Sequence, residues 1–185
     1  IKAGYGYDFA PSIKSELKVI MGLAPEGHLD DAGRVKTVTS DSDREKANRH
    51  LKMAQMLEKR SDFEAALKQL ETAARIDPNS VECRLELGRI YCLMSEPEKA
   101  IREVRDINPA DTAFQTTRAF VLGKAYGQLE DYSRAESHLL AAIESDPEHS
   151  RAYYELGKIY QLQGQTDKAI KAYRQSLDLI YEHAK

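Results

Sequence analysis

Glycines with a spacing typical of nucleotide sites occur near the start of the chain, but the residues around them do not support that chemistry. Gly22 and Gly27 have the separation found in a phosphate-binding loop, yet His28 and Leu29 stand where the loop requires Lys and then Ser or Thr. The "GYG" of residues 4–6 lacks the third glycine of a dinucleotide-binding motif. We therefore expect no nucleotide cofactor.

Histidines and cysteines are likewise present without the spacing that metal binding or nucleophilic catalysis requires. The five histidines are scattered, with no HExxH motif and no Cys/His cluster, so a structural metal is not expected. Cys83 and Cys92 lie nine residues apart, which fits neither a CxxC motif nor a disulfide framework. Two reduced thiols are typical of an intracellular protein. The sequence thus predicts a cytoplasmic protein that is not an enzyme.

Composition excludes two further classes of partner. The net charge of −3 gives no reason to expect nucleic acid, whose phosphates recruit clearly basic surfaces. No apolar run approaches the roughly 20 residues that cross a membrane, so no membrane span is expected. Charged residues at 31% and hydrophobic residues at 42% indicate a globular chain, and 185 residues suffice for one ordinary domain with an appendage.

A base that directly follows a glycine recurs along the chain, which makes the surrounding pattern the main clue. The stretches "LGRIY", "LGKAY" and "LGKIY" contain Gly88, Gly123 and Gly157, which are 35 and 34 residues apart. Ala54 occupies the same register 34 residues before Gly88. An alanine follows each of these small residues after 12 positions: Ala66, Ala100, Ala135 and Ala169. The sequence therefore repeats a unit of about 34 residues four times.

These columns resemble the tetratricopeptide repeat (TPR) family, whose 34-residue pattern is L-G-x2-Y…A-x3-F…P. The resemblance covers about residues 47–183. It implies an all-α fold, a right-handed superhelical solenoid of four helix-turn-helix units whose first helices line the concave side. We expect a TPR domain over residues 41–185, with repeats at about 47–80, 81–115, 116–149 and 150–183.

Physical considerations support helices at these positions and predict where they depart from regularity. The Leu, small and Tyr positions form one apolar stripe on a 3.6-residue period. Ser61, Ser95 and Thr166, with nearby acids, are expected to cap second helices, and Pro97 suits a first helical turn. The proline at Pro109 arrives early. We therefore predict a short second helix in repeat two and a long first helix in repeat three.

Both ends of the chain carry apolar segments outside the repeat pattern. Residues 1–40 are expected to form a mostly irregular extension with one short amphipathic helix at 12–21 and a linker after it. This extension is interpreted as part of a neighbouring domain, as a cap on the first repeat or as a ligand in a TPR groove. Leu177, Ile180 and Tyr181 leave the last helix apolar, so we expect self-association through the C-terminal helix or the N-terminal segment.

A second stripe on each first helix predicts the binding surface. One of its columns is apolar, and the next changes from polar to basic. In TPR proteins such positions face the concave surface, where peptides bind. Bases would hold carboxylates through charge-assisted hydrogen bonds, and apolar side chains would be buried beside them. The alternative is that the bases are ordinary exposed helix formers. The predicted peptide-binding residues are Leu51, Gln55, Leu85, Arg89, Phe120, Lys124, Arg151, Tyr154 and Lys158.

The predicted function is a non-catalytic scaffold that binds a peptide segment or partner protein, with a preference for acidic and apolar side chains. Chaperone tails are disfavoured, because Leu51, Gln55, Thr117 and Val121 occupy the places of the Lys, Asn and Arg residues that hold such tails. Two alternatives stay open. The chain is either a regulatory or substrate-docking arm of a larger multidomain enzyme, or a self-assembly module.

Overall fold

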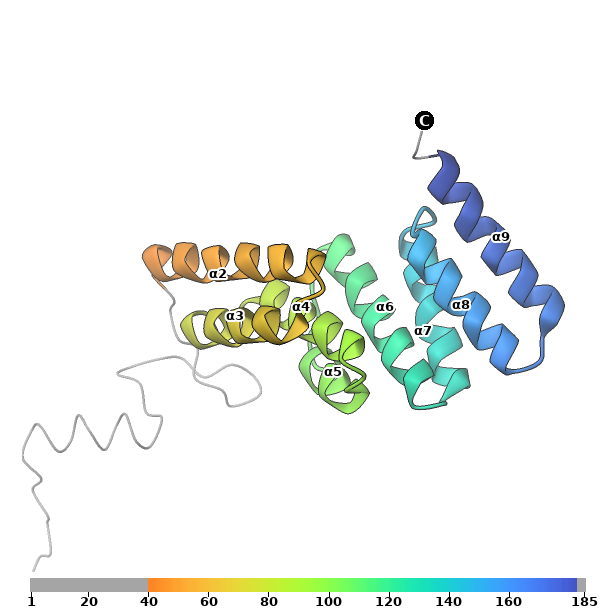
Figure 1. Ribbon diagram of the computed structural model, residues 1–185, viewed down its shortest axis with the longest axis horizontal. Helices are drawn as coiled ribbons and strands as arrows, with labels where there is room; N and C mark the ends of the chain where they lie inside the picture. The colour runs from red at the N-terminus through yellow and green to blue at the C-terminus, as the bar shows by residue number, and fades with distance from the viewer. Residues whose placement is uncertain (1–39, 183–185) are drawn as a thin grey trace, which may run out of the picture.

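A computed structural model describes residues 40–182 of the chain, and these residues form helices joined by short turns (Figure 1). No strand occurs in this part of the chain. The predicted helix at 12–21 lies outside the described residues. The helices are α2 (Asp41–Lys59), α3 (Phe63–Ile76), α4 (Val81–Leu93), α5 (Pro97–Val104), α6 (Thr112–Gln128), α7 (Tyr132–Ser145), α8 (Ser150–Leu162) and α9 (Thr166–Glu182).

The helices pack as four consecutive pairs, which confirms the predicted all-α architecture of helix-turn-helix units. Each second helix also contacts the first helix of the following pair, so α3 contacts α4, α5 contacts α6 and α7 contacts α8. Three apolar clusters fill these junctions along the chain. Because each cluster draws on neighbouring pairs, no pair buries its apolar faces alone.

The small residues of the repeat permit close approach of the two helices in a pair. A Cβ atom built on Gly123 would lie 2.6 Å from Cγ of Leu139, and one on Gly88 would lie 2.7 Å from Cγ1 of Val104. These distances are shorter than carbon atoms tolerate, so a larger residue would push the helices apart. The glycines therefore serve close helix packing.

The second and third repeats depart from regularity as predicted. Helix α5 has 8 residues, whereas α3 and α7 have 14, and α6 has 17 residues against 13 in α4 and α8. The guanidinium of Arg118 on α6 donates hydrogen bonds to the carbonyls of Val104 at 2.9 Å and Arg105 at 2.6 Å. Arg118 thus satisfies carbonyls that the shortened α5 leaves without a helical partner.

The helix starts correct one sequence prediction. Ser61 and Ser95 do not cap the second helices, because both have left-handed backbones with φ near 60° and lie one residue too early. Asp62 caps α3 by accepting a hydrogen bond from the Ala65 amide. Thr166 is the first residue of α9 itself. Pro97 does stand in the first turn of α5, as predicted.

No helix among residues 40–182 has both the length and the apolar character needed to span a membrane.

Candidate functional site

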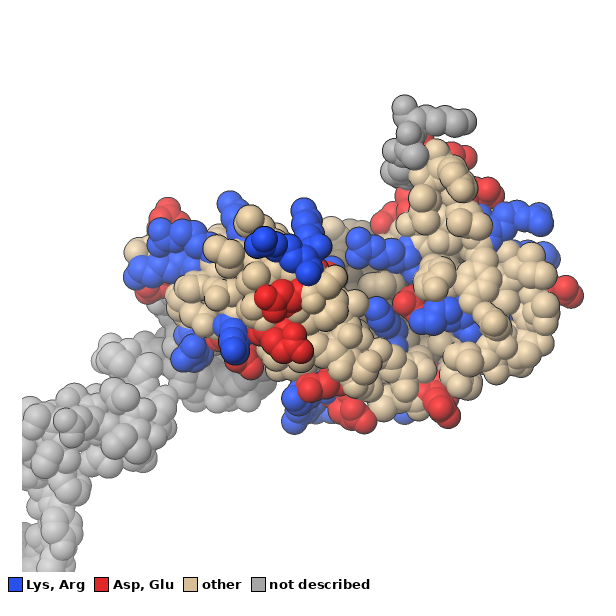
Figure 2. Space-filling model, in the orientation of Figure 1, with Lys and Arg blue, Asp and Glu red and all other residues tan. Residues whose placement is uncertain are grey.

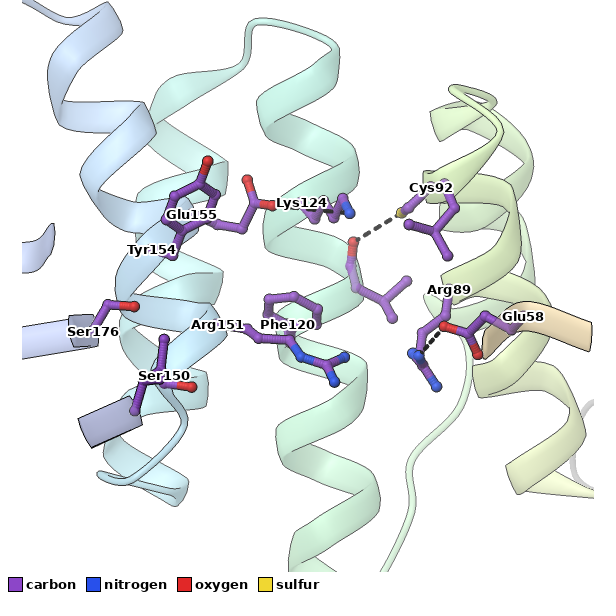
Figure 3. Close-up of a pocket in the computed structure, with 13 residues that line it drawn as sticks. Glu58, Arg89, Cys92, Phe120, Lys124, Ser150, Arg151, Tyr154, Glu155 and Ser176 are labelled. Atoms are coloured by element: carbon purple, nitrogen blue, oxygen red, sulfur yellow. Dashed lines mark hydrogen bonds and ion pairs between the residues drawn. The ribbon is translucent and has the colours of Figure 1, made fainter. Parts of the chain in front are cut away.

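A pocket on the side of the first helices is lined by several of the predicted binding residues (Figure 3). It encloses about 290 Å³ and draws side chains from α2, α4, α6, α8 and α9. We call it the first-helix pocket. Its lining is Glu58, Arg89, Cys92, Leu93, Phe120, Val121, Lys124, Ser150, Arg151, Tyr154, Glu155, Ser176 and Ile180.

A second cavity of about 340 Å³ adjoins the first-helix pocket and extends it toward the start of α8. The two share Arg89, Phe120, Ser150 and Arg151. The adjoining cavity adds Glu86, Thr117, Glu148 and His149. The combined surface therefore continues from the C-terminal end of α2 to the N-terminal end of α8.

The structure brings five of the nine predicted residues together in the first-helix pocket. These are Arg89, Phe120, Lys124, Arg151 and Tyr154. The other four, which do not line it, are Leu51, Gln55, Leu85 and Lys158. Whether any of the nine contacts a ligand stays a prediction.

The predicted apolar column is buried in every repeat except the last. Leu51 and Leu85 are 5% and 2% exposed and belong to the apolar clusters between neighbouring pairs. Phe120 is also buried, whereas Tyr154 is 51% exposed. The difference follows from stacking, because α4 and α6 contact the first helices that follow them, and no described first helix follows α8. The column is therefore core in three repeats, and only its last member is open.

Arg89 is held between two carboxylates at one end of the pocket. Its guanidinium donates to Oε1 of Glu58 at 2.5 Å and to Oε2 of Glu86 at 2.7 Å. Glu58 belongs to α2, so this contact joins repeats one and two (Figure 3). Burial raises the pKa of Glu86 above its ordinary value, although Arg89 acts in the opposite direction. The charge of Arg89 is thus already matched inside the protein.

Lys124 and Lys158 share a single carboxylate at the other end. The Nζ atom of Lys158 lies 2.7 Å from Oε2 of Glu155, and the Nζ atom of Lys124 lies 3.9 Å from Oε1. Arg151, which is exposed, forms no salt bridge within residues 40–182. Lys124, Arg151 and Lys158 therefore outnumber the two carboxylates of this half of the surface, Glu155 and Glu148, which leaves it with an excess of positive charge.

Aromatic and aliphatic side chains provide the apolar part of the pocket. The ring of Phe120 lies 4.9 Å from the ring of His149, measured between centroids. Nδ1 of His149 accepts a hydrogen bond from the Ala152 amide at 3.1 Å and so caps α8. Burial lowers the pKa of His149, which favours the neutral form that this cap requires. The ring of Tyr154 lies 5.7 Å from that of Tyr173.

Sequence reasoning did not place Ser176 and Ile180 in this pocket. Both belong to α9, the second helix of the last repeat, whereas the prediction considered first helices alone. The apolar character of Ile180 was visible in the sequence, but it indicated an uncovered end of the solenoid. With 17 residues against 13, α9 extends past the first residues of α8, which it packs against in the antiparallel direction, and its length was the available signal (Figure 1).

The cysteines show no features of a reactive or metal-binding site. Burial raises the pKa of both Cys83 and Cys92 to about 12, so neither forms a thiolate near neutral pH. The thiol of Cys92 points toward the Val121 carbonyl at 3.7 Å (Figure 3). No group of three or more possible metal ligands occurs within residues 40–182.

Comparison with family models gives two matches, both described as tetratricopeptide repeat. They cover residues 57–118 and residues 120–180. These segments together extend from the end of the first helix to the last turns of α9.

Curated relatives are longer proteins that this chain matches in part. BBSome complex member BBS4 of Mus musculus is 31% identical over 125 residues, which is 66% of this chain and 23% of the relative. E3 SUMO-protein ligase RanBP2 of Homo sapiens is 27% identical over 85 residues, which is 46% of this chain and 3% of the relative. The chain thus spans less than a quarter of either relative.

Solved structures share the arrangement of helices. A crystal structure of MamA superposes with a TM-score of 0.54 and 29% identity, covering 68% of this chain and 73% of that chain. The thermophilic TPR protein TTC0263 of Thermus thermophilus superposes with a TM-score of 0.65 at 22% identity, covering 72% and 74%. The second likeness concerns the fold alone.

Proposed function

The chain belongs to the tetratricopeptide repeat family, and from that premise we propose that it is a non-catalytic interaction module that binds a peptide segment in the first-helix pocket. The ligand combines an acidic group with apolar side chains. The observation that carries this proposal is the coincidence of an unpaired base, Arg151, with the exposed ring of Tyr154 in one pocket.

Arg151 and Lys124 are the bases best placed to receive a ligand carboxylate. Arg151 has no carboxylate partner within residues 40–182, and Lys124 has only a 3.9 Å contact to Glu155. A guanidinium can bind a carboxylate through two parallel hydrogen bonds, which gives both strength and orientation. Arg89 has a supporting role, because it positions Glu58 and Glu86 rather than facing the pocket uncompensated.

Apolar contacts would supply the remaining affinity. Tyr154 and Ile180 are 51% exposed, and Leu93 is 37% exposed. All three line the pocket together with Phe120. Covering such side chains releases water from apolar surface, at about 25 cal/mol for each Å² that is buried. Aromatic side chains in a pocket are also the residues that most often dominate binding energy.

A selection from a random library of 12-residue peptides, followed by fluorescence anisotropy on one enriched peptide, tests the proposal. We expect Arg151→Gln and Tyr154→Ala each to weaken binding by about tenfold, the usual scale for a central contact. Arg174→Gln, an exposed arginine on α9 outside the pocket, is the matched control. If the control weakens binding as much as Arg151→Gln does, or if no peptide is enriched, the pocket is not the site.

Self-association through α9 is a second candidate function, and the exposure of this helix favours it. Ile170 and Leu177 are 52% exposed, and Tyr181 is 68% exposed. Leu67 of the first repeat corresponds to Ile170, and Ile143 of the third repeat corresponds to Leu177. Both earlier residues pack against the apolar clusters between neighbouring pairs. Light scattering over a concentration series tests this candidate. A mass that stays at that of one chain would remove it.

A further inference from the structure

The outer face of α2 is exposed although its counterparts in later repeats are buried. Met53 and Met56 are 48% and 62% exposed. Leu87 and Ile90 occupy the same columns in α4, where they are 5% and 1% exposed and pack against the second helix of the preceding pair. The columns of α6 and α8 are buried in the same way, through Leu122, Ala125, Leu156 and Ile159. The face of α2 therefore has the form of a helix-packing surface without a described partner.

Basic side chains surround the two methionines. Arg49, Lys52, Lys59 and Arg60 are all exposed, and none forms a salt bridge within residues 40–182. At 100° per residue they fall with Met53 and Met56 within an arc of about 120°. Figure 2 shows Lys and Arg side chains gathered over α2. We call these six residues the α2 outer face.

The one acidic residue between Arg49 and Arg60 lies on the opposite side of α2 from the α2 outer face. Between Arg49 and Arg60 the sequence has one carboxylate, Glu58, which lies in the first-helix pocket and pairs with Arg89. The exposed Glu45 lies one turn before Arg49 within the same arc, so the four bases leave a local charge of about +3 beside apolar surface, which is costly because like charges repel one another. A segment with acids next to leucines would neutralise the bases and cover the methionines at once.

Such a segment lies nine residues before α2 in the sequence. Residues 23–31, "LAPEGHLDD", carry Glu26, Asp30 and Asp31 and contain no Lys or Arg. They also carry Leu23 and Leu29. By contrast, residues 12–21 contain two lysines and one glutamate, so their charge does not complement the α2 outer face.

The chain between this segment and α2 is long enough for the contact. Residues 32–40 are nine residues, which reach at most about 30 Å when extended. Arg60 lies about 28 Å along α2 from its first residue, at 1.5 Å per residue, and Arg49 lies about 12 Å along it. A tethered segment also binds as if at high concentration, without the loss of freedom that a separate partner pays.

We propose that residues 23–31 dock on the α2 outer face of their own chain, with Glu26, Asp30 and Asp31 against the bases and the two leucines against Met53 and Met56. This contact is separate from the first-helix pocket. It closes the end of the helical stack that the described residues leave open.

A spin label on the full chain tests the proposal. His28→Cys provides the attachment point, and the native thiols of Cys83 and Cys92 stay unlabelled because they are buried with pKa values of about 12. We expect the amide signals of residues 49–60 to lose more than half their intensity, while those of α9 do not change. Broadening confined to the first-helix pocket or to any other surface would overturn the proposal, as would no intramolecular broadening.

Charge exchange separates a specific contact from proximity in sequence. Arg49→Glu/Arg60→Glu should abolish the broadening of residues 49–60, and Asp30→Lys/Asp31→Lys on that background should restore it. The matched control is Lys171→Glu/Arg174→Glu on α9, which should leave the broadening as it is. Broadening that survives the first pair of substitutions, or that the second pair does not restore, contradicts the assignment. A circular dichroism melt of each variant confirms that the helices persist.

Discussion

Arg89 and Lys124 occupy the same column of adjacent repeats and line the same pocket, yet their surroundings differ. Arg89 contacts two carboxylates at 2.5 Å and 2.7 Å, and these three side chains are at most 21% exposed. Lys124 lies 3.9 Å from one carboxylate, which Lys158 also uses. Two bases at the same position of adjacent repeats therefore differ in how freely they can pair with a ligand carboxylate. In the α2–α4 half the charge of Arg89 is fully matched by carboxylates, whereas the α6–α8 half has more bases than carboxylates.

Charge reversal in the α6–α8 half should have the largest effect on binding. We expect Lys124→Glu/Arg151→Glu to weaken binding of a library-selected acidic peptide by about a hundredfold, since each reversal replaces attraction by repulsion. Arg89→Gln/Glu58→Gln removes a pair without changing net charge and should weaken it by less than about threefold. Fluorescence anisotropy measures both. An equal loss for the two variants would erase the distinction between the halves.

Substitution in the α2–α4 half should reduce the stability of the fold more than substitution in the α6–α8 half. Arg89→Ala leaves Glu58 and Glu86 without their shared partner in a partly buried site, and should cost about 1–2 kcal/mol in the free energy of unfolding. Lys124→Ala should cost less than about 0.5 kcal/mol, as is usual for a loose pair. Urea denaturation of the two variants gives the comparison. A greater cost for Lys124→Ala would show that the pairing of Arg89 does not stabilise the fold.

The pH dependence of stability should reveal Glu86 in the α2–α4 half. Because burial raises the folded-state pKa of Glu86 above its ordinary value of 4.5, the folded state holds the proton more tightly than the unfolded state. Its contribution is therefore fully present below pH 4.5 and is lost as pH rises through the folded pKa. As the pH rises through the folded-state pKa of Glu86, the Glu86→Gln variant should become more stable relative to the wild type. If the free energies of unfolding of Glu86→Gln and the wild type change by the same amount between pH 4 and pH 7, this prediction is contradicted.

His149 in the α6–α8 half should show the opposite sign and the smallest effect. Burial lowers its pKa below 6.5, so its contribution is present above pH 6.5 and is lost as pH falls through the folded pKa. The loss should be about 1 kcal/mol or less, the scale of one helix cap. His149→Asn replaces the capping nitrogen with a side-chain oxygen that accepts the same amide hydrogen bond, and it removes the titration. Thermal melts at pH 8 and pH 5 should then differ less for the variant than for the wild type.

Much of the fold could be predicted because the residues that determine helix packing recur at a fixed spacing in the sequence. The glycine and alanine columns marked where helices meet, and the early Pro109 indicated a short α5 and a long α6. Cap positions were less accessible, because Ser61 and Asp62 are equally suitable by type. Only the left-handed backbone of Ser61 decides between them.

The arrangement of the site could be predicted only in part, since it depends on contacts between repeats. Glu58 lies 31 residues before Arg89, and no local pattern specifies that their side chains meet. The burial of Leu85 likewise depends on how closely the following first helix, α6, packs against α4. Sequence columns identify which residues share a face, whereas the angle between pairs decides which of them stay open.

A chemical-shift titration is the most direct test of ligand binding in the first-helix pocket. A ¹⁵N-labelled full chain would be titrated with one peptide enriched from the random library. We expect the largest amide shifts to fall on Phe120, Lys124, Arg151 and Tyr154. Largest shifts on the α2 outer face or along Ile170–Tyr181 of α9, with these four residues unchanged, would contradict it.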